Sequence, residues 1–382
     1  MPLLGVRSLH PSRIKGEFVQ TLSRDAYLPA GTLQSTFFQM IKVNLYRNLV
    51  SRLLLVLSLA LVCGSFSVSL AQQEPVDVVR TDTSLVQLNV GVVDSRGRAV
   101  TSLSRNDFAV YEDGVKQTIF QFEPTNAPFS VVLLLDMSGS TISFREQLKL
   151  ATTRFLDALA PEDRVAVVQF NAKVKRLSNF DANRKDTAYA IKIAEGAGET
   201  HLYEALTYAL KELQREEKRR KAIVVLTDGL DTNMRNVDRA AVAKAQTDEE
   251  ALSAIRPHAS APLTAVLNLA DRQGVTIFPL ALPSGDPKRL PIPGPDITGI
   301  YAAARTRLES IANRTGGRLT EINRLDQMAR LYAEVAANLR TLYTVAYQAP
   351  GDRPRDGKWH EIKVEVAYPE LIARTRPGYF AR

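Results

Sequence analysis

SVVLLLDMSGST, residues 130–141, is the stretch of sequence that decides the fold. Its first half is a continuous apolar run of the kind found in a strand buried on both faces, and its second half is small and rich in hydroxyl groups. From Phe144 to Leu159, apolar residues then recur at helical spacing. A buried strand, a polar turn and an amphipathic helix in this order predict one unit of a sheet covered by helices.

The same alternation continues for two hundred residues. A polar, helical insertion is expected over 231–260, and five prolines predict a loop over 283–299. Further strands are predicted at 165–170, 173–177, 222–228, 275–282 and 318–321, and further helices at 202–213, up to Ala270, at 301–314 and at 324–341. The predicted fold class is therefore α/β, with a doubly wound, mostly parallel, Rossmann-like sheet flanked by helices.

Two segments of different character lie on either side of this region. Residues 75–126 and 342–382 carry short β-rich runs separated by turn sequences such as Glu112-Asp113-Gly114. We expect both to form one small β-sandwich, with the α/β domain of residues 128–341 inserted into it and Trp359 in its core.

The N-terminal part reads as a targeting segment. Residues 40–71 have a basic start, an apolar run over Leu53–Val62 and small residues before a cleavage point after Ala71, which is typical of a signal peptide. The run is shorter than the roughly 20 residues of a membrane-spanning helix, so a retained anchor is the less favoured alternative. Residues 1–39 are interpreted as a misassigned upstream extension, and the mature protein is expected to be secreted or periplasmic, without a membrane span.

Charge and composition exclude several functions. Residues 1–71 hold 7 of the 49 basic and 2 of the 41 acidic residues, so the remainder carries only about +3 and is not expected to bind nucleic acid. The single cysteine, Cys63, lies in the signal segment, and the four histidines are too scattered for a zinc set of their own. The oligomeric state is not indicated by the sequence.

Oxygen-bearing side chains follow two strands and one loop. Asp136, Ser138 and Ser140 come after the strand at 130–136, Asp228 ends the strand at 222–228, and Thr200 precedes the helix at 202–213. Because parallel strands bring their carboxyl ends to one edge of the sheet, we expect these five side chains to converge there. Carboxylates and hydroxyls suit a hard divalent cation.

Three segments resemble the metal-ion-dependent adhesion site of von Willebrand factor A domains: LLLDMSGST, GETHLYEAL and VVLTDGLDT. The likeness covers about residues 128–341, and the chain after the signal segment also resembles a related family abundant in acidobacteria. It implies that Ser138 and Ser140 bind Mg²⁺ (or Mn²⁺ or Ca²⁺) directly, Thr200 directly or through water, and Asp136 and Asp228 largely through water. The last position would take an Asp or Glu carboxylate of a protein partner, in adhesion or surface-complex assembly.

The same residues allow other interpretations. Ser138 or Ser140 could simply cap the following helix, and Glu199 could approach the ion or repel an acidic ligand. The protein is expected not to be an enzyme, because a Mg²⁺-dependent phosphotransferase would need a second aspartate where Ser138 stands. A metal-independent scaffold of the cell envelope is the main alternative function.

Overall fold

The computed structural model describes residues 85–216, 219–284, 286–349 and 357–381, all within the compact unit Arg80–Arg382. The upstream extension 1–39 and the signal segment 40–71 lie outside the described residues. These assignments, and the domain limits drawn from the sequence, stay predictions.

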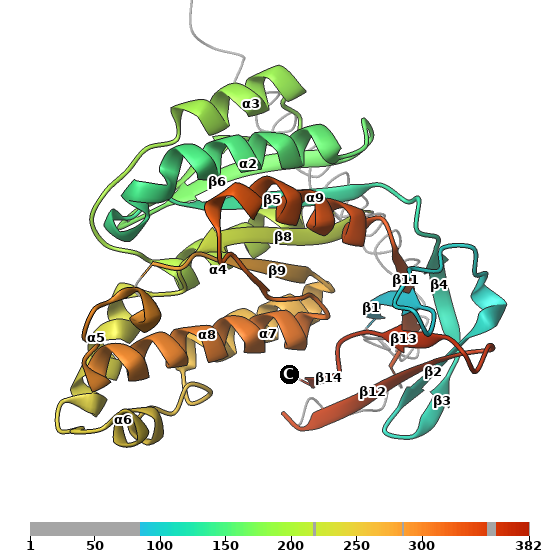
Figure 1. The fold of residues 1–382 in the computed structure, drawn as a ribbon. Coiled ribbons are helices and arrows are strands. Elements are labelled where there is room, and N and C mark those ends of the chain that lie inside the picture. Colours follow the sequence, from blue (N-terminus) through green and yellow to red (C-terminus); the bar gives the residue numbers. More distant parts are fainter. Residues whose placement is uncertain (1–84, 217–218, 285, 350–356, 382) are drawn as a thin grey trace, which may run out of the picture. The chain divides into compact units, whose positions relative to one another are not determined.

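A six-stranded sheet forms the centre of the α/β region (Figure 1). Every neighbouring pair is parallel except the last, where the edge strand β7 runs antiparallel to β6. In spatial order the strands are β10 (Thr320–Glu321), β9 (Thr276–Ala281), β8 (Arg220–Thr227), β5 (Phe129–Asp136), β6 (Arg164–Phe170) and β7 (Val174–Ser178). The mostly parallel α/β fold class predicted from the sequence is confirmed.

Helices cover both faces of this sheet because alternate residues of β5 are buried on opposite sides. Val131, Leu133 and Leu135 pack with α2, α3 and α9, whereas Val132 and Leu134 pack with α4, α7 and α8. The helices are α2 (Arg145–Ala158), α3 (Arg184–Ile193), α4 (Leu202–Gln214), α5 (Thr232–Val242), α6 (Asp248–Ala254), α7 (Ala261–Gln273), α8 (Pro295–Thr315) and α9 (Met328–Leu339). None of the helices in the described ranges has the length and hydrophobicity needed to cross a membrane.

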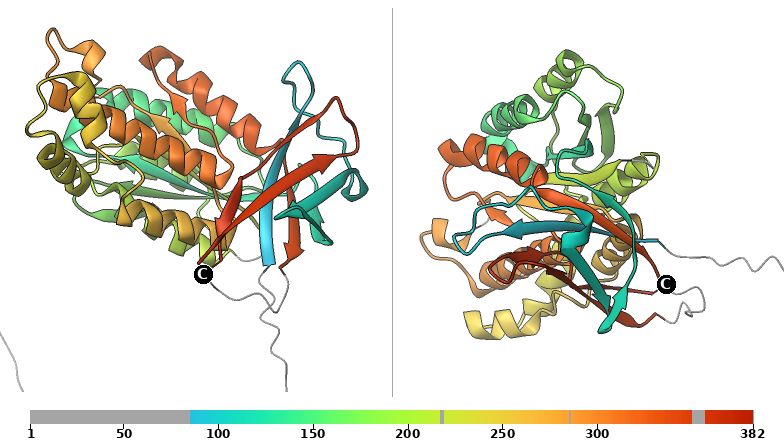
Figure 2. Two further views of the ribbon diagram at one scale, coloured as in Figure 1. Left: turned by 90° about the horizontal axis from the view of Figure 1, so that it is seen from below. Right: turned by 90° about the vertical axis from the view of Figure 1, so that its right-hand side faces the viewer.

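Two four-stranded sheets pair strands from both ends of the described chain. Figure 2 shows the cyan strands of the first segment interleaved with the red strands of the last. The sheet orders are β13-β1-β11-β4 and β14-β12-β2-β3, with β1 (Leu85–Val93), β2 (Phe108–Glu112), β3 (Val115–Gln117), β4 (Ile119–Glu123), β11 (Leu342–Gln348), β12 (Trp359–Val366), β13 (Ile372–Arg374) and β14 (Gly378–Phe380). Buried residues of both sheets form one core, so these strands make the small sandwich that the sequence suggested.

A buried arginine holds the two connections between sandwich and α/β region. The Nη1 atom of Arg220 donates hydrogen bonds to the carbonyl oxygens of Pro124, Thr125 and Ala127 at 3.2, 2.9 and 3.1 Å. Its Nη2 atom donates to the carbonyl oxygen of Leu339 at 2.8 Å. Strand β4 precedes the first connection and β11 follows the second. One side chain therefore binds both the segment that leaves the sandwich and the segment that leads back into it.

Two local expectations were wrong, and one helix was missed. The proline-rich loop ends early, because Pro295 starts helix α8 from a position where its missing N–H costs nothing. Helix α3 was not predicted at all, since its ten residues are mostly polar and bury only three side chains. Trp359 lies outside the sandwich core, 38% exposed, with the guanidinium carbon of Arg314 4.2 Å from its ring centre.

Candidate functional site

The carboxyl end of β5 places Asp136 in a fully buried position. Both of its carboxylate oxygens accept hydrogen bonds: Oδ1 from the backbone N–H of Ser138 at 3.0 Å, and Oδ2 from the hydroxyl of Thr227 at 2.7 Å. Because Thr227 is the last residue of β8, this second bond links the ends of two neighbouring strands.

The two serines lie side by side just beyond β5. Their Oγ atoms are 3.2 Å apart, with Ser138 buried and Ser140 exposed. Ser138 occupies the N-cap position of the 3₁₀ turn Gly139–Phe144, yet its side chain makes no capping hydrogen bond. The Ser138 hydroxyl therefore does not cap this turn.

Asp228 directly follows β8 and is also fully buried. Its Oδ1 accepts from the backbone N–H of Leu230 at 3.0 Å, while its Oδ2 has no hydrogen-bond partner among the described residues. The next residue, Gly229, has a φ of +83°, and a Cβ there would lie 2.8 Å from Leu308. Glycine is thus required for the chain to turn away after Asp228.

The loop that carries Thr200 is held against both of these strand ends. The backbone N–H of Gly139 donates to the carbonyl of Gly198 at 2.9 Å, and a Cβ on Gly196 would come within 2.6 Å of the Met137 carbonyl oxygen. On the other side, Thr200 exchanges hydrogen bonds with Thr232, which follows the Asp228 turn, at 2.9 and 2.8 Å. Thr200 itself is 5% exposed.

Burial raises the pKa values of both carboxyl groups. Burial, and after it the negative charge of Asp228, raises the pKa of Asp136 to about 7. Burial likewise raises the pKa of Asp228, against hydrogen bonds from Ser140 and the Leu230 backbone and the more distant charges of Arg305 and Arg235. Among the described residues, no lysine or arginine forms an ion pair with either carboxylate.

Three contributors to this geometry were missed from the sequence. Thr227 orients Asp136, as described above. Arg145 donates through Nη2 to the carbonyl oxygens of Ser138 at 3.4 Å and Gly196 at 2.9 Å, and Arg305 donates to the carbonyl oxygen of Asp228. The threonine stands next to Asp228 and could have been noticed, but nothing local marks the two arginines, because they act on backbone atoms distant in sequence.

The arrangement brings together the segments of all five predicted site residues. The side chains of Asp136, Ser138, Ser140 and Asp228 interact with one another or with the adjoining backbone, and Thr200 lies on the loop that is hydrogen-bonded to both strand ends. A family model described as the von Willebrand factor type A domain matches residues 131–230, which include all five. Residues 131–230 therefore match a von Willebrand factor A (VWA) domain. No curated protein matches the sequence.

Several solved structures are similar to this chain at low identity. The VWA-type domain of the type V pili tip protein Mfa5 from Porphyromonas gingivalis is 16% identical, with 56% of this chain and 95% of that chain covered and a TM-score of 0.42. A VWA protein from Catenulispora acidiphila is 14% identical, with 79% and 64% covered and a TM-score of 0.42. Proximal thread matrix protein 1 from the mussel byssus, solved with a zinc-occupied site, is 15% identical, with 59% and 49% covered and a TM-score of 0.39.

Proposed function

We propose that this chain is a binding module whose VWA domain holds one divalent cation and uses it to capture a carboxylate of a protein partner. VWA domains generally bind protein partners and are typically interaction modules rather than enzymes. The residues proposed to hold the cation are Asp136, Ser138, Ser140, Thr200 and Asp228, with Mg²⁺ as the expected ion and Mn²⁺ or Ca²⁺ as substitutes.

The observation that carries the proposal is the buried pair of carboxyl groups at the sheet edge. Oδ2 of Asp228 has no hydrogen-bond partner among the described residues, and burial, followed by the charge of Asp228, raises the pKa of Asp136. Two buried acids without a basic partner are costly to ionise, and a cation removes that cost. Hydroxyl and carboxylate oxygens are the ligands that Mg²⁺ accepts.

The hydrogen bonds of Asp136 support an indirect role for this residue. Both of its oxygens already accept bonds from Ser138 and Thr227, which suits a carboxylate that reaches the ion through water. With few charged groups in direct contact, a Mg²⁺ ion retains enough positive charge to attract an outside acid.

The outer side of the site is open to a partner. Gly139, Ser140, Gly198 and Glu199 are all exposed, although Ser138, Thr200 and both aspartates are buried. The Glu199 carboxylate lies 3.3 Å from Nε2 of His201, on the rim rather than against Asp136 or Asp228. A ligand carboxylate would therefore approach from the side of Ser140 and the Gly198 loop.

Thermal unfolding with Mg²⁺ and with excess chelator tests the cation site. Mg²⁺ should raise the unfolding temperature of the wild type by mass action, and Asp136→Ala and Ser138→Ala should abolish the rise. Asp181→Asn is the matched control, because Asp181 pairs with Arg164 at the opposite end of β6. If neither Mg²⁺ nor Mn²⁺ changes the unfolding temperature of the wild type, the result would favour a metal-independent scaffold.

Partner capture tests the second half of the proposal. Immobilised peptides with one exposed Asp or Glu should retain the protein in Mg²⁺ but not in chelator, whereas their Asn or Gln counterparts should not retain it. Retention of Asp136→Ala, or retention that survives chelator, would count against cation-mediated capture.

We also propose that the protein acts outside the cytoplasm, after removal of residues 40–71. The support is the signal-like sequence of that segment. Mass spectrometry of the native protein should find an N-terminus near Gln72, and peptides from residues 1–60 would contradict this.

A further inference from the structure

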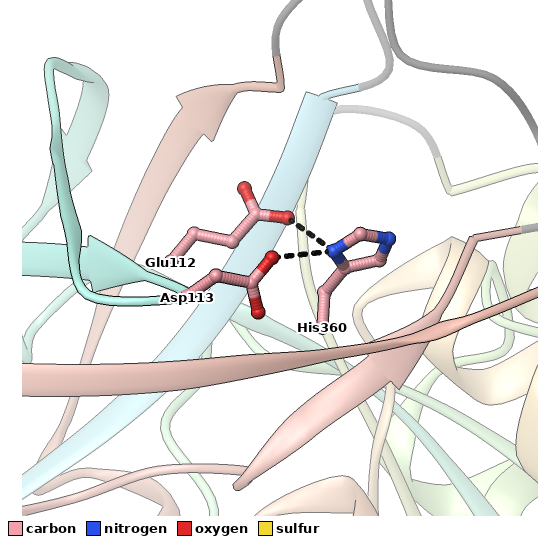
Figure 3. Close-up of side chains that lie close together, drawn as sticks. All are labelled: Glu112, Asp113 and His360. Carbon is pink, nitrogen blue, oxygen red and sulfur yellow. Dashed lines mark hydrogen bonds and ion pairs between the residues drawn. The ribbon is translucent and has the colours of Figure 1, made fainter.

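A second group of metal-ligating side chains lies in the sandwich, outside the VWA domain. Glu112 is the last residue of β2 and Asp113 begins the turn to β3, while His360 belongs to β12. Strands β2 and β12 pair antiparallel with Ile362 opposite Glu112, which places His360 two residues away along the same face. Figure 3 shows the three side chains converging, with the imidazole ring pointing between the two carboxylates.

Two of these side chains occupy positions that the strand pattern reserves for the core. Val110 and Ile362 face the sandwich interior, and Glu112 and His360 continue their rows, 0% and 9% exposed. A carboxylate and an imidazole at inward positions lose most of their hydration and need compensating partners. Burial of these two polar side chains costs folding free energy unless other groups compensate for the lost hydration.

The distances between the ligand atoms are those of a compact site. Nδ1 of His360 lies 2.7 Å from Oδ2 of Asp113 and 3.8 Å from Oε1 of Glu112, and the three atoms lie within 4.8 Å of one another. Four ligands about 2.0 Å from a zinc ion are about 3.3 Å apart in a tetrahedron. The two measured separations lie on either side of that value, so small side-chain rotations suffice.

Neighbouring groups already orient the two carboxylates. The hydroxyl of Tyr379 donates to Oε1 of Glu112 at 2.7 Å, and the backbone N–H of Glu361 donates to Oδ1 of Asp113 at 2.9 Å. Outer hydrogen bonds of this kind are what hold ligating carboxylates in protein metal centres.

We propose that Glu112, Asp113 and His360 bind one divalent transition-metal ion, with Zn²⁺ as the best-suited ion, independently of the VWA cation. An imidazole ligand favours zinc over magnesium or calcium, which prefer oxygen alone. The Asp113 side chain is 42% exposed, which leaves one side open for entry and for water as a further ligand. The ion takes the place of the hydrogen bond between Asp113 and His360 and ties the β2–β3 turn to β12.

Isothermal titration of the Asp136→Ala protein with Zn²⁺ separates this site from the VWA site. One equivalent of Zn²⁺ should still bind, and the unfolding temperature should rise by several degrees. His360→Gln in the same background should remove both effects. The control His258→Gln should keep them, because the Nδ1 atom of His258 lies beside Ser310 on α8 instead. Co²⁺ should give the visible absorption of a tetrahedral site.

A second variant keeps the test decisive if His360→Gln fails to fold. Asp113→Asn retains the acceptor for the Glu361 N–H, and asparagine tolerates the φ of +50° at this position. It should fold and bind Zn²⁺ at least tenfold more weakly. Absence of binding in Asp136→Ala, or unchanged binding in either His360→Gln or Asp113→Asn when that variant folds, would overturn the proposal. Neither outcome bears on the VWA cation.

Discussion

Buried aspartates occur in two kinds of surroundings in this protein. Asp238 on α5 receives a two-pronged ion pair from Arg307 on α8, at 2.6 and 2.7 Å. Asp271 on α7 is similarly held by Arg314 at 2.6 Å and lies 3.4 Å from a guanidinium nitrogen of Arg376. Both aspartates sit among helices, where an arginine supplies the opposite charge within the fold.

Asp136 and Asp228 are at least as deeply buried but receive only hydroxyl and backbone hydrogen bonds. Arg305 lies close to Asp228, yet its guanidinium donates to carbonyl oxygens rather than to the carboxylate. Arginine therefore pairs with the two aspartates among the helices and with neither at the sheet edge. Asp163 and Asp231 are also buried, and backbone N–H groups hold their carboxylates. At the Asp136–Asp228 pair, two buried carboxyl groups lie close together, and we propose that a bound cation supplies the opposite charge there.

The largest expected effect comes from breaking a complete pair. Asp238→Ala leaves the buried Arg307 guanidinium without its acid and should lower the free energy of unfolding by about 3 to 5 kcal/mol. Denaturant titration measures the loss. The double variant Asp238→Leu with Arg307→Met should recover much of it, because an apolar pair needs no counter-charge. A loss below about 1 kcal/mol for Asp238→Ala would show that this ion pair contributes little to the stability of the fold.

A smaller effect on stability is expected from a change of pH. In chelator, folded Asp136 has a pKa of about 7 against an ordinary 3.8, so the folded state keeps a proton that the unfolded state releases. The protonated Asp136 carboxyl group contributes on the order of 2 to 4 kcal/mol to the free energy of unfolding. This contribution is complete below about pH 4 and is lost as the pH rises to about 7. Asp136→Asn should lack that decline, and Mg²⁺ should suppress it. Parallel profiles for wild type and variant would contradict this.

Asp228→Asn should behave oppositely with and without the cation. Without it, removing an unpaired buried charge should leave stability unchanged or raise it by about 1 kcal/mol, since the bond from Leu230 is kept. With Mg²⁺, the stabilisation seen in the wild type should disappear. Unfolding curves in chelator and in Mg²⁺ measure both, and a variant that is destabilised in chelator would show that Asp228 serves the fold.

The smallest change concerns an orienting residue. Thr227→Val keeps the shape of the side chain but removes the hydroxyl that donates to Asp136. Mg²⁺ affinity should fall about tenfold, as for other groups that orient ligands from behind. Titration followed by thermal shift measures this, and Thr232→Val provides a comparison on the Thr200 side. Equal affinity in Thr227→Val and wild type would leave Asp136 oriented by Ser138 alone.

The α/β fold and the candidate site could be predicted because their signals are local. Each strand that carries a site residue is a short apolar run, and each site segment follows directly from a strand or leads into a helix. The start of α8 at Pro295 and the existence of α3 could not be predicted as easily. Proline is both a loop former and a good first helical residue, and a helix that buries little has weak periodicity.

The sequence by itself determined the order of most strands and helices and the choice of five oxygen-bearing residues, because hydrophobic periodicity and strand polarity act over neighbouring residues. Only the tertiary structure decided which acids have a basic partner and which do not. It also placed His360 against Asp113, 247 residues earlier in the chain. Such pairings follow from strand register and helix packing, which bring together residues that no local pattern connects.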